Sequence, residues 1–208
     1  AGSEANGKQL RRDARRDLVR AYVHASKPSQ AWGFFGKWGK GPGGDEDDIK
    51  KMMKLLANQY FGEGKYVEST FIYKKLQQEF ESDPDACEWQ SRIVVNTLAE
   101  DNKKVQWNET KRLGEYWTAY KESDKKKSVK RKCRDSALDT MKQMATVWHD
   151  EAEKTRLDET YELAEQAYQG FLDVFPGDKD AYELQYYYGE LLWALATNNY
   201  EQKDDASR

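Results

Sequence analysis

The sequence has few of the residues that interrupt helices or bind metals. Among 208 residues there are four prolines, two histidines and two cysteines. The two cysteines, Cys87 and Cys133, lie 46 residues apart, and this spacing suits neither a metal site nor a redox motif. A disulfide between them stays open as the less favoured alternative. The longest apolar run, residues 191–196, is far shorter than the roughly 18 residues of a membrane span. We therefore predict no metal, no cofactor and no membrane-spanning helix.

The chain is rich in charge, yet its aromatic content argues against disorder. Charged residues make up 34% of the sequence and the mean hydropathy is -1.04. Seven Trp, 13 Tyr and seven Phe supply burial energy that disordered chains lack. Glu, Lys, Gln, Leu and Ala outweigh the β-branched residues, which favours helix over sheet. The composition predicts an all-α protein.

The charge is unevenly distributed along the chain. Residues 135–208 hold 17 acidic and 6 basic side chains, a net charge of -11, which leaves +8 for residues 1–134. Two stretches concentrate the bases. Lys121 to Arg134 contains eight bases against two acids, and a basic stripe with i, i+4 spacing runs down the first predicted helix through Arg11, Arg12, Arg15, Arg16 and Arg20. Such a run is attractive to nucleic acid or anionic lipid. The sequence pI of about 5.6 and the absence of a recognition motif make nucleic acid an unfavoured partner.

One spacing of large and small residues recurs along the chain. The first occurrence is Leu18, Val19, Tyr22, Ala31, Phe35 and Trp38, and the same spacings recur 38 residues later in Leu56, Ala57, Tyr60, Ser69, Tyr73 and Leu76. A third occurrence is Trp148, Ala152, Ala164, Tyr168, Phe171 and Pro176. Small residues at these places let two antiparallel helices approach closely, and the aromatic residues fill the space between helix pairs.

This pattern resembles the tetratricopeptide repeat (TPR) family. The long repeats, with their endings at residues 80–84 and 174–177, are most similar to those of envelope-associated TPR proteins of myxobacteria and their relatives. The resemblance implies a right-handed TPR-like α-solenoid of about four helix-turn-helix pairs plus a final helix. It also implies a bacterial periplasmic or outer-membrane-associated location, with the cytoplasm next. We expect residues 1–208 to form one solenoid belonging to a longer protein.

We predict helices at about 8–25, 29–38, 46–62, 65–82, 85–99, 103–121, 132–155, 157–175 and 179–197. The first pair with a Gly-rich linker takes residues 1–44, the second and third pairs take 45–121, a basic linker takes 122–134, and acidic repeats take 135–208. Gln106 occupies a place where a small residue is expected, and Gly114, Trp117 and Tyr120 restore the pattern seven residues later. We interpret this as an overlong second helix in the third pair.

No catalytic arrangement stands out. His24 and His149 lack zinc or catalytic spacing. The glycines between residues 36 and 44 are not followed by the Ser or Thr of a phosphate-binding loop, and we interpret that stretch as a linker. The acids at 45–48 lack the alternating ligands of a calcium loop and are better explained as favourable charges at a helix N-terminus. We predict that the chain is not an enzyme.

The TPR resemblance implies instead a groove that binds a peptide or helix of a partner protein. Lys54 and Asn58 match the lysine and asparagine with which some family members hold a terminal carboxylate, and Arg16 and Arg20 add positive charge. The predicted partner-binding residues are Arg16, Arg20, Lys54, Asn58, Phe61, Ser91 and His149.

Two other functions stay open. The first is a structural spacer that self-associates through residues Tyr186 to Trp193, on a helix whose buried face we expect to contain Tyr188, Leu192 and Leu195. The second is binding of nucleic acid or lipid through the basic stretch 121–134.

Overall fold

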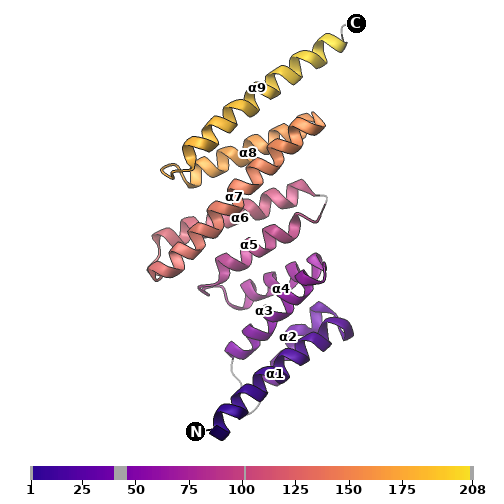
Figure 1. Ribbon diagram of the computed structural model, residues 1–208, viewed down its shortest axis with the longest axis vertical. Helices are drawn as coiled ribbons and strands as arrows, with labels where there is room; N and C mark the ends of the chain where they lie inside the picture. The colour runs from indigo at the N-terminus through magenta and orange to yellow at the C-terminus, as the bar shows by residue number, and fades with distance from the viewer. Residues whose placement is uncertain (1, 40–45, 101, 207–208) are drawn as a thin grey trace. The chain divides into compact units, whose positions relative to one another are not determined.

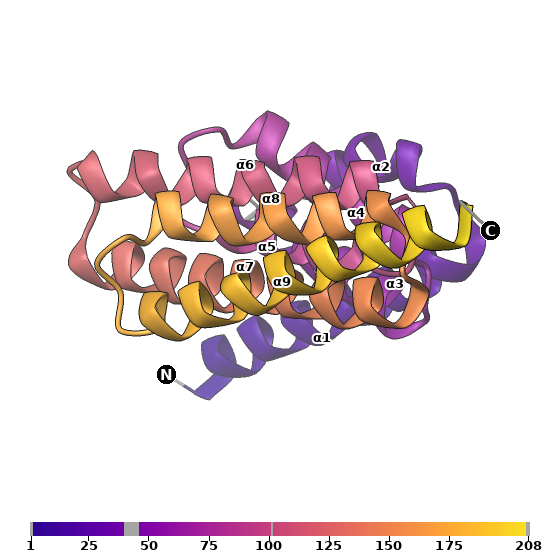
Figure 2. The ribbon, with the colours of Figure 1, turned by 90° about the horizontal axis from the view of Figure 1, so that it is seen from above.

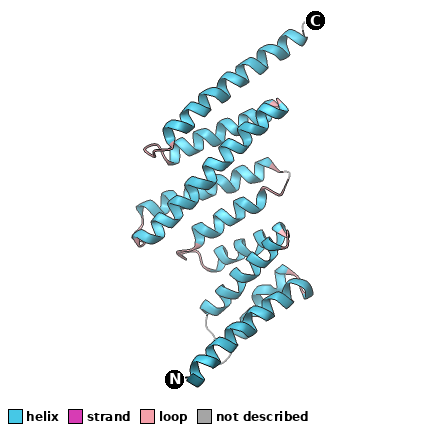
Figure 3. Ribbon diagram, in the orientation of Figure 1, coloured by secondary structure: helices cyan, strands magenta, loops and turns pink. Residues whose placement is uncertain are grey.

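The computed structural model describes the backbone of residues 2–39, 46–100 and 102–206, and the side chains of residues 7, 9–37, 47–100 and 102–198. Every regular element in these ranges is a helix, and none of the described residues lies in a strand (Figure 3). The prediction of an all-α protein is confirmed. The chain divides into two compact units, Ala1–Glu100 and Asp101–Arg208, which we call the N-terminal and the C-terminal unit.

The N-terminal unit contains α1 (Gly2–Ala25), the short 3₁₀ helix η1 (Pro28–Gln30), α2 (Ala31–Gly39), α3 (Glu46–Gly62), α4 (Tyr66–Glu79) and α5 (Ala86–Thr97) (Figure 1). Helix α3 packs against α1, α2 and α4, and α5 packs against α4. Gly64 forms the turn between α3 and α4 with a φ of 72°, a conformation that glycine adopts without strain.

The C-terminal unit contains α6 (Lys103–Glu122), α7 (Lys127–Thr155), α8 (Asp158–Val174) and α9 (Ala181–Ala206). Helix α7 contacts the other three helices of the unit, α6 also contacts α8, and α8 also contacts α9. Seen along the unit, α6 and α8 lie side by side in one layer, and α7 and α9 lie side by side in the other (Figure 2).

The residues of the repeated spacing form the cores of both units. Ala31, Ala57, Ser69 and Ala164 are completely buried. The aromatic residues of the same pattern are at most 3% exposed: Tyr22, Phe35, Tyr60, Tyr73, Tyr168 and Phe171. Burial of each large side chain stabilises the fold by roughly 1.5–3 kcal/mol, so these positions supply much of the driving force for packing. The other residues of the pattern are buried as well, except that Leu18 is half-buried and Pro176 is exposed. The side chain of Trp38 lies outside the described residues.

The irregular third pair packs differently from the pattern. Gln106 is buried, and its Oε1 accepts a hydrogen bond from Trp148 Nε1 at 3.3 Å, so a polar amide takes the place of a small residue. Gly114 is buried, as expected for the shifted small position. The unit boundary falls between α5 and α6, so the two helices of the predicted third pair belong to different units.

The basic stretch is mostly helical, whereas the sequence predicted a linker at 122–134. Helix α6 ends at Glu122 and α7 begins at Lys127, five residues before the predicted start of that helix. Lysine and arginine have good helix propensity, and Cys133 and Ala137 bury the inner face of these turns. Of the predicted Gly-rich linker, Gly36 lies within α2, and residues 40–45, Asp45 included, lie outside the described residues.

The buried face of the final helix overlaps the predicted one, since Tyr188 and Leu195 are half-buried and Tyr188 stacks on Tyr168. Ala181, Leu184 and Leu191 are buried, whereas Leu192 is 40% exposed. The prediction was wrong for Leu192 alone, because the stripe that contacts α7 and α8 runs through Leu184 and Leu191. Helix α9 also continues to Ala206, beyond the predicted end at 197.

Both cysteines are buried, Cys87 in α5 and Cys133 in α7, and neither is a free thiol. The preference for reduced cysteines is wrong, because a cysteine count does not report oxidation state. None of the described helices is both long enough and apolar enough to cross a membrane.

Candidate functional site

A groove of about 620 Å³ lies between α1 and α3 in the N-terminal unit. Cationic side chains dominate its lining: Arg11, Arg12, Arg15, Arg16 and Lys51. Met52 and Leu55 of α3 give it an apolar floor, and Asp48 is its single carboxylate. We call this the cationic groove.

The single carboxylate is shared by two of the cations. An Arg15 guanidinium nitrogen lies 2.6 Å from Asp48 Oδ2, and Lys51 Nζ lies 4.0 Å from Asp48 Oδ1. Within the described side chains, Arg11 and Arg12 have no carboxylate partner, and Arg16 lies 3.9 Å from the half-exposed Asp13. The cationic groove therefore has more positive charge than its own acids neutralise.

The local sequence explains why the arginines gather on one face of α1. Arg11 and Arg15, and likewise Arg12 and Arg16, are four residues apart and therefore lie one above the other on the helix. Val19 and Tyr22 are buried on the packed side of the same helix. Long arginine stems cover apolar surface while their charged ends stay in water, so the floor of Met52 and Leu55 is compatible with this cover.

Two of the predicted binding residues are engaged within the chain. Lys54 Nζ lies 3.1 Å from Asp85 Oδ2 and 3.5 Å from Glu88 Oε2. Asn58 Oδ1 accepts a hydrogen bond of 2.7 Å from the Tyr73 hydroxyl, and burial raises the pKa of Tyr73 to about 12. A peptide carboxylate at Lys54 would have to compete with Asp85, the residue before α5, and with Glu88 in its first turn.

The other predicted residues of the N-terminal unit lie apart from the cationic groove. Arg20 points into solvent beside Asp17, at 3.6 Å. Phe61 packs edge-on against Tyr66, with 5.5 Å between ring centroids. Ser91 is half-buried in α5 and has an interaction partner. Of the predicted set, Arg16 alone lines this groove.

His149 belongs to the C-terminal unit and is 8% exposed. Its Nδ1 lies 2.9 Å from the Tyr168 hydroxyl, and its Nε2 lies 3.6 Å from Glu153. Burial also raises the pKa of Tyr168. This geometry is that of a histidine held in a core hydrogen bond rather than one presented to a ligand.

The alternative basic stretch is partly engaged. Lys125 lies over the Tyr120 ring at 4.7 Å, Lys130 Nζ donates to the backbone carbonyl of Lys121 at 3.1 Å, and Arg134 pairs with Asp178. The first two contacts hold the end of α6 against the start of α7, and the third ties α7 to the connection between α8 and α9. Together they explain part of the charge run without an external anion.

Sequence reasoning identified the arginine stripe but not the groove it lines. Arg11, Arg12 and Arg15 were recognised as a basic face of one helix, yet they were left out of the predicted site. Met52 and Leu55 were missed, because nothing in the sequence says which face of α3 meets α1. The i, i+4 spacing of the arginines was the sequence feature that could have placed all of them in the predicted site.

In the ranges that the structure describes, no group of three or more His, Cys, Asp or Glu side chains is arranged to hold a metal ion. No protein-family model, curated protein or solved structure matches this chain.

Proposed function

We propose that the chain is a non-catalytic scaffold of TPR-like helix pairs, arranged as a right-handed solenoid, that binds an acidic segment of a partner protein in the cationic groove. Consecutive helices joined by short turns, with small and aromatic residues buried between them, support the repeat architecture. The groove between α1 and α3 supports the binding role.

The observation that carries the proposal is the excess of cations over an apolar floor. Arg11, Arg12 and Arg16 are exposed at the rim, and Met52 is buried beneath them. Guanidinium groups bind carboxylates through paired, charge-assisted hydrogen bonds. The ligand that fits is a peptide in which Asp or Glu alternates with apolar residues.

The experiment measures binding of a fluorescent peptide of alternating Glu and Leu by anisotropy. The double variant Arg12→Glu/Arg16→Glu reverses two exposed charges at the rim, and we expect its affinity to fall by at least about tenfold. Raising the salt from about 50 mM to about 500 mM should weaken binding to the wild-type chain, because screening lengths shorten over this range.

A matched control keeps the net charge change but leaves the groove intact. Lys27→Glu/Arg92→Glu alters two exposed cations of the same unit that do not line the groove. This control should retain wild-type affinity. Equal losses in both double variants, or binding that is insensitive to Arg12 and Arg16, would contradict the proposal.

One observation favours a second candidate, self-association through α9. Tyr182, Tyr186 and Trp193 lie along one face of this helix and are 82%, 62% and 74% exposed. Three large apolar side chains in one exposed stripe are a common feature of interaction surfaces. This surface suits the structural spacer, whose partner is a second copy of the chain.

Light scattering over a range of concentrations separates the two candidates. A mass that rises with concentration in the wild-type chain, and stays that of a monomer in Tyr186→Gln/Trp193→Gln, supports the spacer. A monomer at all concentrations removes it and leaves the acidic-peptide scaffold.

A further inference from the structure

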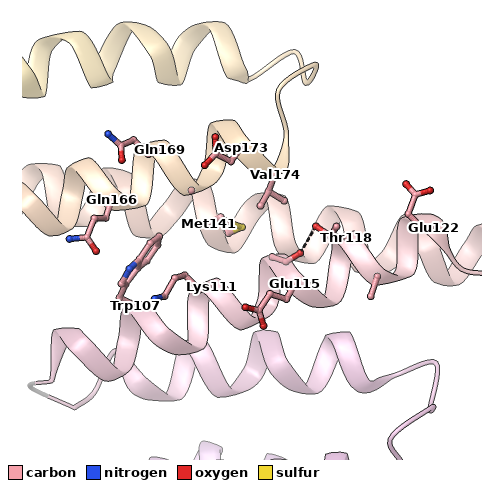
Figure 4. Close-up of a pocket in the computed structure, with 13 residues that line it drawn as sticks. Trp107, Lys111, Glu115, Thr118, Glu122, Met141, Gln166, Gln169, Asp173 and Val174 are labelled. Carbon is pink, nitrogen blue, oxygen red and sulfur yellow. Dashed lines mark hydrogen bonds between the residues drawn. The ribbon is translucent and has the colours of Figure 1, made fainter.

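A hollow of about 730 Å³ in the C-terminal unit lies between α6 and α8, and Met141 of α7 also lines it. Its walls are apolar: Trp107 of α6, Met141 of α7 and Val174 of α8 (Figure 4). This volume is within the range of sites that hold one bulky side chain or a small ligand. We call it the α6–α8 pocket.

Two glycines keep the pocket open. A Cβ at Gly170 would lie 2.8 Å from Trp107 Cη2, and one at Gly114 would lie 3.1 Å from Val174 Cγ2. Both glycines are in helices, where glycine is disfavoured relative to alanine. Their presence is explained by close packing, since any larger residue would push against the apolar walls.

The rim of the pocket carries an excess of negative charge. Glu115 and Glu122 of α6 and Asp173 of α8 lie around it, and no ion pair involves any of them in the described part of the chain. Lys111 is the rim's single cation, and its ammonium lies over the Trp107 ring, 5.5 Å from the centroid. Figure 4 shows Glu115 projecting from α6 and Asp173 from α8.

We propose that the α6–α8 pocket binds a basic peptide segment of a partner protein, with one bulky apolar side chain seated against Trp107 and Met141 and flanking Lys or Arg residues near Glu115 and Asp173. The apolar walls select the side chain, and the unpaired carboxylates select the charge beside it. This site is separate from the cationic groove and takes a ligand of opposite charge.

The test uses a fluorescent probe peptide with one Trp between pairs of lysines, and the full chain. Two control probes replace Trp with Ala, or all lysines with glutamates. We expect each control probe to bind more than about tenfold more weakly, because one loses the apolar burial and the other reverses the charge attraction. Equal affinities of the Trp and Ala probes would contradict the proposal that the pocket holds a bulky side chain, and would leave only a general attraction to an acidic surface.

Variants locate the binding on the chain. Glu115→Lys/Asp173→Lys should weaken the Trp probe about tenfold, whereas Asp139→Lys/Asp150→Lys, an equal change in net charge on α7 away from this pocket, should not. Ala119→Trp fills the pocket from an exposed position of α6 and should remove the preference for Trp over Ala. Far-ultraviolet circular dichroism checks that each variant is folded.

Failure of this proposal is distinguishable from failure of the proposed function. The basic Trp probe should bind Arg12→Glu/Arg16→Glu as it binds the wild-type chain, and the acidic probe should bind Glu115→Lys/Asp173→Lys unchanged. Two results would show that a basic partner peptide does not occupy the α6–α8 pocket. One is that Glu115→Lys/Asp173→Lys and Ala119→Trp leave the affinity for the Trp probe unchanged, and the other is that a second copy of the chain displaces the probe from the same site.

Discussion

The two units place opposite charges around similar apolar hollows. The cationic groove of the N-terminal unit surrounds Met52 and Leu55 with arginines, and the α6–α8 pocket surrounds Trp107 and Met141 with carboxylates. The net charges of the two units have the same signs as these sites, but that of the N-terminal unit is close to zero. Residues 1–100 hold 16 bases and 15 acids, and residues 101–208 hold 18 bases and 22 acids, so the units carry +1 and -4. The local arrangement of side chains, more than the total, sets the charge around each hollow.

The units also differ in how they satisfy buried polar groups. In the described part of the N-terminal unit, the hydroxyl of Tyr60 and the indole nitrogen of Trp89 are buried without a hydrogen-bond partner. In the C-terminal unit, the corresponding groups of Tyr168 and Trp148 are bonded to His149 and Gln106. A buried polar group without a partner costs stability, so we expect the N-terminal unit to contain the less optimised core.

The largest expected effect is the loss of a central indole. Trp148 is 1% exposed, and Trp148→Ala should cost about 3–5 kcal/mol of unfolding free energy through lost burial and the cavity it leaves. Hydrogen exchange should show lost protection in α6, α7 and α8. Equal loss of protection throughout α3, α4 and α5 would show that the two units unfold as one and would remove the comparison between them.

The next largest effect is the dependence of folding stability on pH. Burial raises the pKa of Tyr73 from 10.0 to about 12, so the neutral form is favoured in the folded state. The associated stability is complete below pH 10 and is lost as pH rises through about 12, a contribution of order 2–3 kcal/mol.

The matched variant is Tyr73→Phe, which cannot ionise. Chemical denaturation at several pH values between about 9 and 12 should show a smaller loss of stability in this variant than in the wild-type chain. Identical pH profiles would mean that the Tyr73 hydroxyl is more accessible to water than its 2% exposure indicates.

The smallest effect compares two tyrosine hydroxyls. Tyr168→Phe removes the hydrogen bond to His149 and should cost about 1 kcal/mol, whereas Tyr60→Phe removes a buried hydroxyl without a partner and should be neutral or slightly stabilising. Thermal unfolding of the two variants measures the difference. A larger loss of stability in Tyr60→Phe than in Tyr168→Phe would show that the Tyr60 hydroxyl has a hydrogen-bond partner, such as water. The two units would then not differ in this respect.

How much the sequence could predict differed between fold and site. The helices and the buried small and aromatic residues could be predicted, because a period of 3.6 residues and a recurring spacing are local properties. The start of α7 could not, since a run of lysines suits both a loop and an exposed helical turn until Cys133 and Ala137 are known to be buried. Lys54 was predicted as a ligand contact, and the structure places the carboxylates of Asp85 and Glu88 beside it.

The sequence by itself determined that this protein is helical, that its core is aromatic, and that arginines line one face of the first helix. Only the tertiary structure decided that Met52 and Leu55 lie beneath those arginines, and that Trp107, Met141 and Val174 enclose a hollow rimmed by acids. The physical reason is that a groove is a relation between helices. The pattern within each helix specifies which face is buried, whereas packing specifies which faces meet and which charges remain unpaired.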